Sequence, residues 1–193
     1  MRLSDIVETS RDVGATRSRK KKQARLAATL RAMSPEEVPV GVSYLSGRLP
    51  QGRIGLGWAI FRDLAPGEPA AAPSLELLET HRRFDELAGV SGSGSTQRRK
   101  DLLGAMFARA TEEERRFLTH LVLGELRQGA LVGVMVEAVS EATGIDAAKV
   151  RRAGMLAGSV PDVATAALLE GEAALSRFEL TLFRPVLPML ASP

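Results

Sequence analysis

The amino-acid sequence predicts an all-α fold: a single domain of roughly nine to eleven helices, followed by an extended C-terminal linker. Apolar residues recur at helical spacing along most of the 193 residues, without a reliable internal repeat. Hydrophobic residues make up 45% of the chain but aromatic residues only 4%, so Ala, Leu and Val dominate, as is typical of closely packed helices. We expect the helical domain to span residues 1–177 and the linker residues 178–193.

Local start and stop signals divide the chain into its expected helices. Ser34 and Thr111 each begin a capping-box pattern, Ser74 and Asp146 are N-cap residues, and Gly158 opens the last helix. Glycines end several of these segments, at positions 47, 129 and 144. The expected helices cover residues 3–13, 17–33, 34–45, 74–88, 96–110, 111–129, 130–143, 146–157 and 158–169.

Three segments lack a helical pattern. In residues 52–64, glycines alternate with Ile54, Leu56 and Trp58, which indicates a short strand or an ordered loop. Residues 65–73 are rich in Pro and Ala and are typical of a connector. Residues 178–193 contain three prolines and no helical period, so we expect an extended segment there.

Composition excludes several classes of protein. The chain has no cysteine, which rules out disulfides and cysteine-ligated metals and fits a reducing cytosol. No apolar run is long enough to span a bilayer, and the polar N-terminus is unlike a signal peptide. We therefore expect a cytoplasmic protein without membrane association.

Positive charge is concentrated in two segments, although the net charge is only +3. Residues 1–33 carry nine cations and three anions, and residues 16–25 carry six cations and no anion. Cations at a helix N-terminus oppose the helix dipole, so their presence there indicates a role outside the helix, such as binding an anionic partner. A solvated helix face is the alternative interpretation.

The second basic segment is SGSGSTQRRK, residues 91–100, in which a glycine-serine run leads into three cations and a helix. Glycine and serine let backbone N–H groups approach a ligand closely, and the helix start favours an anion. The adjacent cations suit a repeated anion such as a nucleic-acid backbone. The alternative is a solvated linker that ends in a charged first turn.

A third feature is GELRQGA, residues 124–130, where one expected helix ends and the next begins at once. Such a corner presents helix-end backbone groups beside the Arg127 guanidinium, which suits a sugar-phosphate strand. Equally, Arg127 could simply complement the dipole of the helix that it ends.

Most residue patterns that are typical of catalytic sites are missing from the sequence. His81 and His120 are isolated, the glycine-serine run lacks the G-K-[ST] ending of a P-loop, and neither G-x-S-x-G nor HExxH occurs. We assign no chemistry to this chain. An enzyme with an unrecognised active site remains a remote alternative.

The order of these motifs resembles the N-terminal DNA-binding domain of ATP-dependent DNA ligases, especially the bacterial, actinobacterial-type members. The resemblance rests on residues 92–95 with the basic helix start, on TEEE at 111–114 and on residues 124–130. It is supported by VETS at 7–10, TRSR at 16–19, YLSG at 44–47 and RPVLPML at 184–190, and so covers nearly the whole chain.

The resemblance implies an all-α monomer that lies across the minor groove and helps to encircle nicked duplex DNA in replication, repair and recombination. It implies DNA-positioning loops at residues 92–100, 127–129 and 158–159, and association with the bacterial nucleoid. The residues expected to contact DNA are Arg17, Arg19, Lys20, Gly92, Ser93, Gly94, Ser95, Thr96, Arg98, Arg99, Lys100, Arg127, Gln128, Gly129, Gly158 and Ser159.

The chain departs from the ligase pattern in its chemistry. Ligases of this family become adenylated on the lysine of a K-x-D-G motif, and none of the five lysines here is followed by x-Asp-Gly. We therefore expect no catalysis and no cofactor for this chain alone. ATP and Mg²⁺ would belong to a catalytic domain beyond the linker. A helical module that docks an acidic protein is the alternative function.

Overall fold

The computed structural model describes residues 1–64, 67–126 and 131–182, and over these residues it is all-α, as predicted. Ten α-helices and one 3₁₀-helix, η1, are present there, and no strand. The helices are α1 (Leu3–Ala15), α2 (Arg19–Ala32), α3 (Val38–Leu45), α4 (Trp58–Arg62), α5 (Leu77–Gly89), α6 (Ser95–Ala108), α7 (Glu112–Leu123), α8 (Leu131–Thr143), α9 (Ala147–Ala157), α10 (Val160–Glu170) and η1 (Glu172–Arg177).

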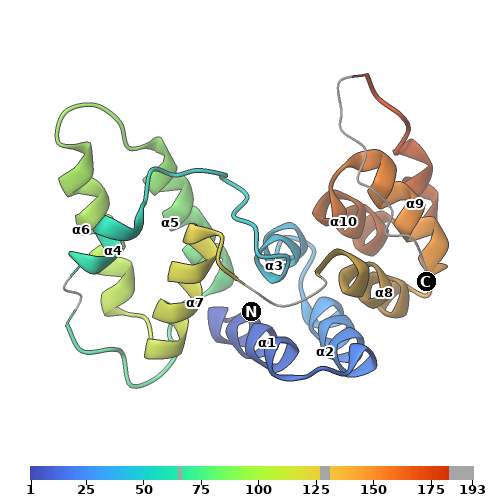
Figure 1. The fold of residues 1–193 in the computed structure, drawn as a ribbon, viewed down its shortest axis with the longest axis horizontal. Helices are drawn as coiled ribbons and strands as arrows, with labels where there is room; N and C mark the ends of the chain where they lie inside the picture. The colour runs from blue at the N-terminus through green and yellow to red at the C-terminus, as the bar shows by residue number, and fades with distance from the viewer. Residues whose placement is uncertain (65–66, 127–130, 183–193) are drawn as a thin grey trace.

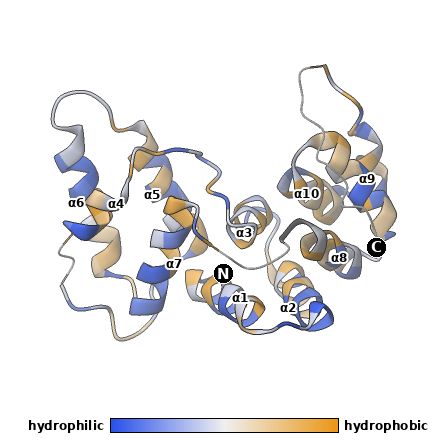
Figure 2. Cartoon of the chain, viewed as in Figure 1, coloured by the Kyte–Doolittle hydropathy of each residue, from blue (hydrophilic) through white to orange (hydrophobic). Residues whose placement is uncertain are grey.

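The helices form two groups along the long axis of the molecule (Figure 1). One group contains α4, α5, α6 and α7, and the other contains α2, α8, α9 and α10, with α1 and α3 between them. Helix α1 packs against α7 of the first group and α2 of the second, and α3 packs against α5 and α10. The apolar faces of the helices turn inward (Figure 2) and build one continuous core through both groups.

Several predicted helix ends are confirmed by the caps. Thr111 and Glu114 form the reciprocal capping box of α7, and the Asp146 carboxylate accepts a hydrogen bond from Ala148 N at the start of α9. Gly144 has a left-handed φ of 76° directly after α8. These ends follow from residues adjacent in sequence, so local patterns were sufficient to predict them.

The predicted start of α3 was wrong. Ser34 N does donate to Glu37 Oε2 at 2.9 Å, but residues 35–37 form a turn and the helix begins at Val38. Pro39 explains the shift, because proline fits only the first turn of a helix, where its missing N–H has no partner to lose.

Two further helix ends also differ from prediction. Helix α7 ends at Leu123 rather than near Gly129, because Gly124 adopts a left-handed φ of 70° and Glu125 N donates to His120 O. Helix α5 begins after Glu76, since the Ser74 hydroxyl donates to the Arg109 carbonyl instead of capping the helix.

The segment predicted as a strand or an ordered loop contains the short helix α4. Residues 52–57 are not helical, and Ile54 and Leu56 anchor them in the core. The 3₁₀-helix η1 lies between α10 and the tail and was not predicted. The described part of the tail, residues 178–182, has no helix.

A buried guanidinium holds the α4–α5 connection against α7. Arg115 is only 9% exposed, and its guanidinium donates to the carbonyls of Phe107, Gly67 and Glu68 at 2.8, 2.9 and 3.0 Å. These hydrogen bonds join α6, α7 and the connecting segment, which has no helix of its own at residues 67–68.

We predict that Arg115→Leu lowers the free energy of unfolding by about 3 kcal/mol, because buried carbonyls lose a charged donor. Urea denaturation followed by circular dichroism measures this loss. Arg116→Leu is the matched control, since Arg116 is the next residue and exposed. Equal stability of the two variants would contradict the anchoring role of Arg115.

Candidate nucleic-acid interface

The glycine-serine loop, residues 91–95, ends in an uncapped helix start. Gly92 and Gly94 have left-handed φ values of 82° and 76°, and a Cβ added at either would meet no atom within 4 Å. Gly94 is the N-cap of α6 and supplies no side-chain cap, and the first turn has no acidic residue. The backbone N–H groups and the partial positive charge at the start of α6 are therefore available to an anion.

The polar side chains of this loop add hydroxyl groups to the helix start. Ser93 and Thr96 are exposed, and Ser95 is half-buried. Ser95 N donates to Gly92 O at 3.2 Å, which closes the loop into a tight turn immediately before α6. Ser93 and Thr96 thus add exposed hydroxyl groups, which suit phosphate oxygens, to the neighbourhood of the backbone amides.

The three cations that follow have different environments. Arg98 is exposed and has no ion pair among the described residues. Arg99 is half-buried, and its Nη2 donates to Val90 O at 2.6 Å. Lys100 Nζ lies 3.7 Å from Asp63, whose pKa is lowered by a hydrogen bond from Arg62 and by the charges of Arg62 and Lys100. Arg98 therefore carries the free charge of this group.

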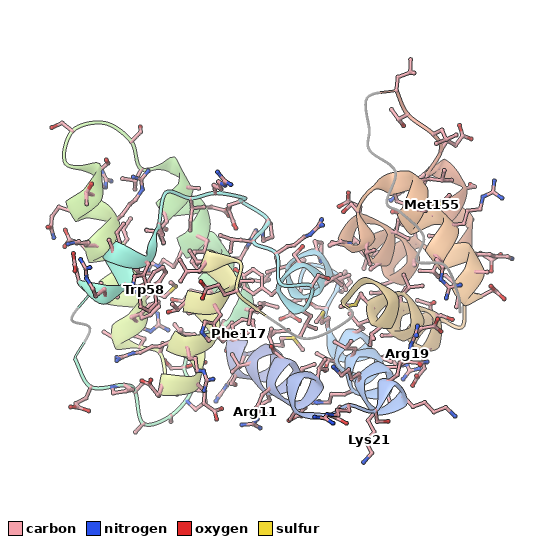
Figure 3. All side chains as sticks on the ribbon, in the orientation of Figure 1. Arg11, Arg19, Lys21, Trp58, Phe117 and Met155 are labelled. Atoms are coloured by element: carbon pink, nitrogen blue, oxygen red, sulfur yellow. The ribbon has the colours of Figure 1, made fainter. Side chains whose placement is uncertain are left out.

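The first basic segment surrounds the start of α2. Ser18 is the N-cap and accepts a hydrogen bond from Lys21 N at 3.4 Å, and the side chains of Arg17, Lys20 and Lys21 are exposed. Arg19 Nη2 lies 3.7 Å from Glu137 on α8. Figure 3 shows Arg19 and Lys21 projecting from the same end of α2. We call residues 16–22 the basic turn.

One arginine on α9, Arg151, joins the basic turn in space and was missed from the sequence. Arg151 and Arg152 are exposed, and Arg151 Nη2 lies 2.7 Å from Glu137, the same carboxylate that Arg19 approaches. The start of α2, the middle of α8 and α9 thus share one surface. Two adjacent arginines were the only sequence signal, and the proximity of Arg151 to Arg19 depends on the tertiary fold.

The turn between α9 and α10 offers a different helix start. Gly158 has a left-handed φ of 64°, and the Ser159 hydroxyl accepts a hydrogen bond from Asp162 N at 3.5 Å. Asp162 lies in the first turn of α10, so a carboxylate already complements the helix dipole there. A DNA contact by Gly158 and Ser159 stays a prediction.

Arg127, Gln128 and Gly129 lie outside the described residues, and their role as DNA contacts also stays a prediction. The structure places the two basic groups toward opposite ends of the long axis (Figure 1): the glycine-serine loop beside α5 and α6, and the basic turn beside α8 and α9. They do not converge on one pocket. An extended polyanion suits this spacing better than a small ligand.

Within residues 1–64, 67–126 and 131–182, no group of three or more His, Asp or Glu side chains could hold a metal ion. Over the same residues, no helix is both long and apolar enough to cross a membrane.

Known proteins are similar to this chain along its whole length. Residues 62–140, which include α5, α6, α7 and the glycine-serine loop, match the family described as DNA ligase N terminus. Probable DNA ligases from Anaeromyxobacter sp. (strain Fw109-5) and Rhodococcus jostii (strain RHA1) are 54% and 50% identical over 100% of this chain. One from Streptomyces griseus is 49% identical over 99% of it. The chain spans only 37% to 38% of the length of these three relatives.

The backbone of the glycine-serine loop gives a stability prediction. We expect Gly94→Ala to lower the free energy of unfolding by about 1 kcal/mol, because a Cβ is strained at left-handed φ, and Gly94→Asn to lower it less. Thermal denaturation measures both. The control is Gly89→Ala in α5, where φ is not left-handed and no atom lies within 4 Å of the added Cβ. A larger loss at Gly89 than at Gly94 would contradict the loop geometry.

Proposed function

We propose that this chain, which belongs to the family of DNA ligase N-terminal domains, binds duplex DNA without sequence preference, through the phosphate backbone and the minor groove. It would be the DNA-positioning domain of an ATP-dependent DNA ligase and would hold nicked duplex in particular. The observation that carries the proposal is the uncapped start of α6 with its exposed Arg98, inside the segment that matches the family.

The chemistry of the contacts explains the lack of sequence preference. Backbone N–H groups of Thr96 and Gln97 and the Arg98 guanidinium are donors that suit phosphate oxygens, which are the same at every base pair. The basic turn and Arg151 add a second group of charges at a distance from the first. A duplex could contact both groups at once, and these contacts fix its position on the domain.

Nick sealing would depend on catalytic domains outside this chain. None of the five lysines of this chain has the K-x-D-G context, and the described residues contain no metal-binding cluster. The residues present thus do not fit ATP and Mg²⁺ as an adenylation site. The catalytic domains that follow in the ligases would bind both, and this chain would present DNA to them as a monomer.

The exposed side chains of Arg17, Lys20 and Lys21 in the basic turn favour one alternative function, the docking of an acidic protein. A competition experiment between DNA and acidic ligands distinguishes the two functions. If DNA is the ligand, a short duplex should displace any acidic protein from the chain, and a polyglutamate peptide of equal charge should compete much less well.

Salt dependence tests the DNA proposal. If about five phosphates are neutralised, the logarithm of the association constant should fall with the logarithm of salt concentration at a slope of roughly −4 to −5. Fluorescence anisotropy of a labelled duplex, nicked and intact, measures the slope and the nick preference together. Binding that does not change from low to moderate salt would contradict the proposal.

Arg98→Ala tests the α6 start. We expect a loss of about five- to tenfold in duplex affinity at low salt and a slope that is shallower by roughly 0.9, because one phosphate contact is removed. Arg83→Ala is the control: Arg83 is also an exposed arginine, but it pairs with Glu86 at 2.9 Å on α5. Identical effects of the two variants would show that only total charge matters and that α6 holds no specific contact.

A further inference from the structure

Trp58 is the only tryptophan of the chain, and it is 62% exposed at the start of α4. Figure 3 shows Trp58 in the helix group that contains α6 and α7. Ile54 and Leu56, at the two preceding alternate positions, are 3% and 9% exposed. The same alternation would bury Trp58, but the chain turns into α4 and leaves the indole in solvent. An exposed indole forfeits the burial that an aromatic side chain of its size would gain in a core.

Helix α4 and the two residues after it are fixed to α6 by three contacts. The ring of Phe61 lies 6.0 Å from that of Phe107, and a Cβ added at Gly104 would lie 3.6 Å from Leu64. Asp63 and Lys100 are 3.7 Å apart. Lys100, Gly104 and Phe107 form one stripe along α6, because they are four and three residues apart. Trp58 thus lies on a helix that packs against α6, whose start is the candidate phosphate site.

The loop that leads to Trp58 is also joined to α6. Gly55 has a left-handed φ of 70°, and a Cβ added there would lie 3.1 Å from the guanidinium carbon of Arg99. The Arg99 guanidinium therefore packs directly beneath the backbone of this loop. Exposed cations lie on both sides of Trp58 in the sequence, with Arg53 before it and Arg62, which pairs with Asp63 at 3.0 Å, after it. An apolar side chain among cations matches a ligand that is both anionic and apolar on its surface.

We infer that Trp58 contacts the duplex that α6 holds, with its indole against the deoxyribose and base edges of the minor groove. This inference rests on the proposed function. Minor-groove proteins commonly combine cations on the phosphates with apolar side chains in the groove. Deoxyribose supplies the apolar surface, and the indole N–H can donate to the acceptors that every base pair presents in the groove. The contact adds affinity without sequence preference.

Intrinsic fluorescence reports on Trp58 alone, since the chain has no other tryptophan. We expect a blue shift of the emission, and at least a twofold drop in acrylamide quenching, when a nicked duplex is added. Both changes should follow the same binding curve as the anisotropy of a labelled duplex. Saturating anisotropy with unchanged emission and unchanged quenching would overturn the inference and leave the proposed function intact. The absence of any anisotropy change would instead overturn the proposed function, and this inference with it.

The Trp58→Ala variant separates an apolar contact from a charged one. We expect a five- to twentyfold loss of duplex affinity with an unchanged salt slope, because no phosphate contact is removed. Leu169→Ala is the matched control, since Leu169 is 42% exposed and lies on α10 in the other helix group. Circular dichroism verifies that both variants fold. Wild-type affinity of Trp58→Ala, or a loss equal to that of Leu169→Ala, would assign the indole to another partner and overturn the inference.

Discussion

The candidate interface depends on the position of one guanidinium. Arg99 donates to the carbonyl of Val90, the C-cap of α5, and packs beneath Gly55 in the loop before α4. It thereby joins the end of α5, the start of α6 and the Gly55 loop. The four residues between Val90 and Ser95 are exposed but are held at both ends. Because this loop is closed by a side chain from within α6, its open glycines and uncapped amides keep a defined position.

The continuous hydrophobic core fixes the positions of the two basic groups relative to each other. Helices α1 and α3 lie between the two helix groups and pack against both, so the glycine-serine loop and the basic turn are held at a fixed separation. Preorganised contacts lose less conformational entropy on binding than contacts on independent segments. A rigid, elongated domain with cations toward both ends is therefore suited to a stiff polyanion, and duplex DNA is stiff over this length.

The fold class and most helices could be predicted because their signals are local. Thr111 with Glu114, and Asp146 before α9, specify helix starts through neighbours three or fewer residues away. Errors arose where two local signals compete. Gly124 and Gly129 both suit a helix end, and the first ends α7. Pro35 and Pro39 both suit a first turn, and the second sets the start of α3.

The candidate site could be predicted only in part, for a different reason. The glycine-serine loop and its three cations could be located from the sequence. The partners of these cations could not, because only the tertiary fold brings Val90 and Gly55 near Arg99, and Asp63 near Lys100. The same holds for Arg151, which meets Arg19 through Glu137. No periodicity identifies Trp58 as exposed, since its alternation with Ile54 and Leu56 predicts the opposite.

Backbone amide hydrogen exchange, measured with and without a nicked duplex, tests the central claim most directly. Exchange at the first turn of α6 is observable because no side chain caps its amides. DNA should slow exchange at Thr96 and Gln97 and in the basic turn, with little change in the buried helix α3. Protection confined to other surfaces, or no protection at α6 when the duplex is bound, would contradict the account.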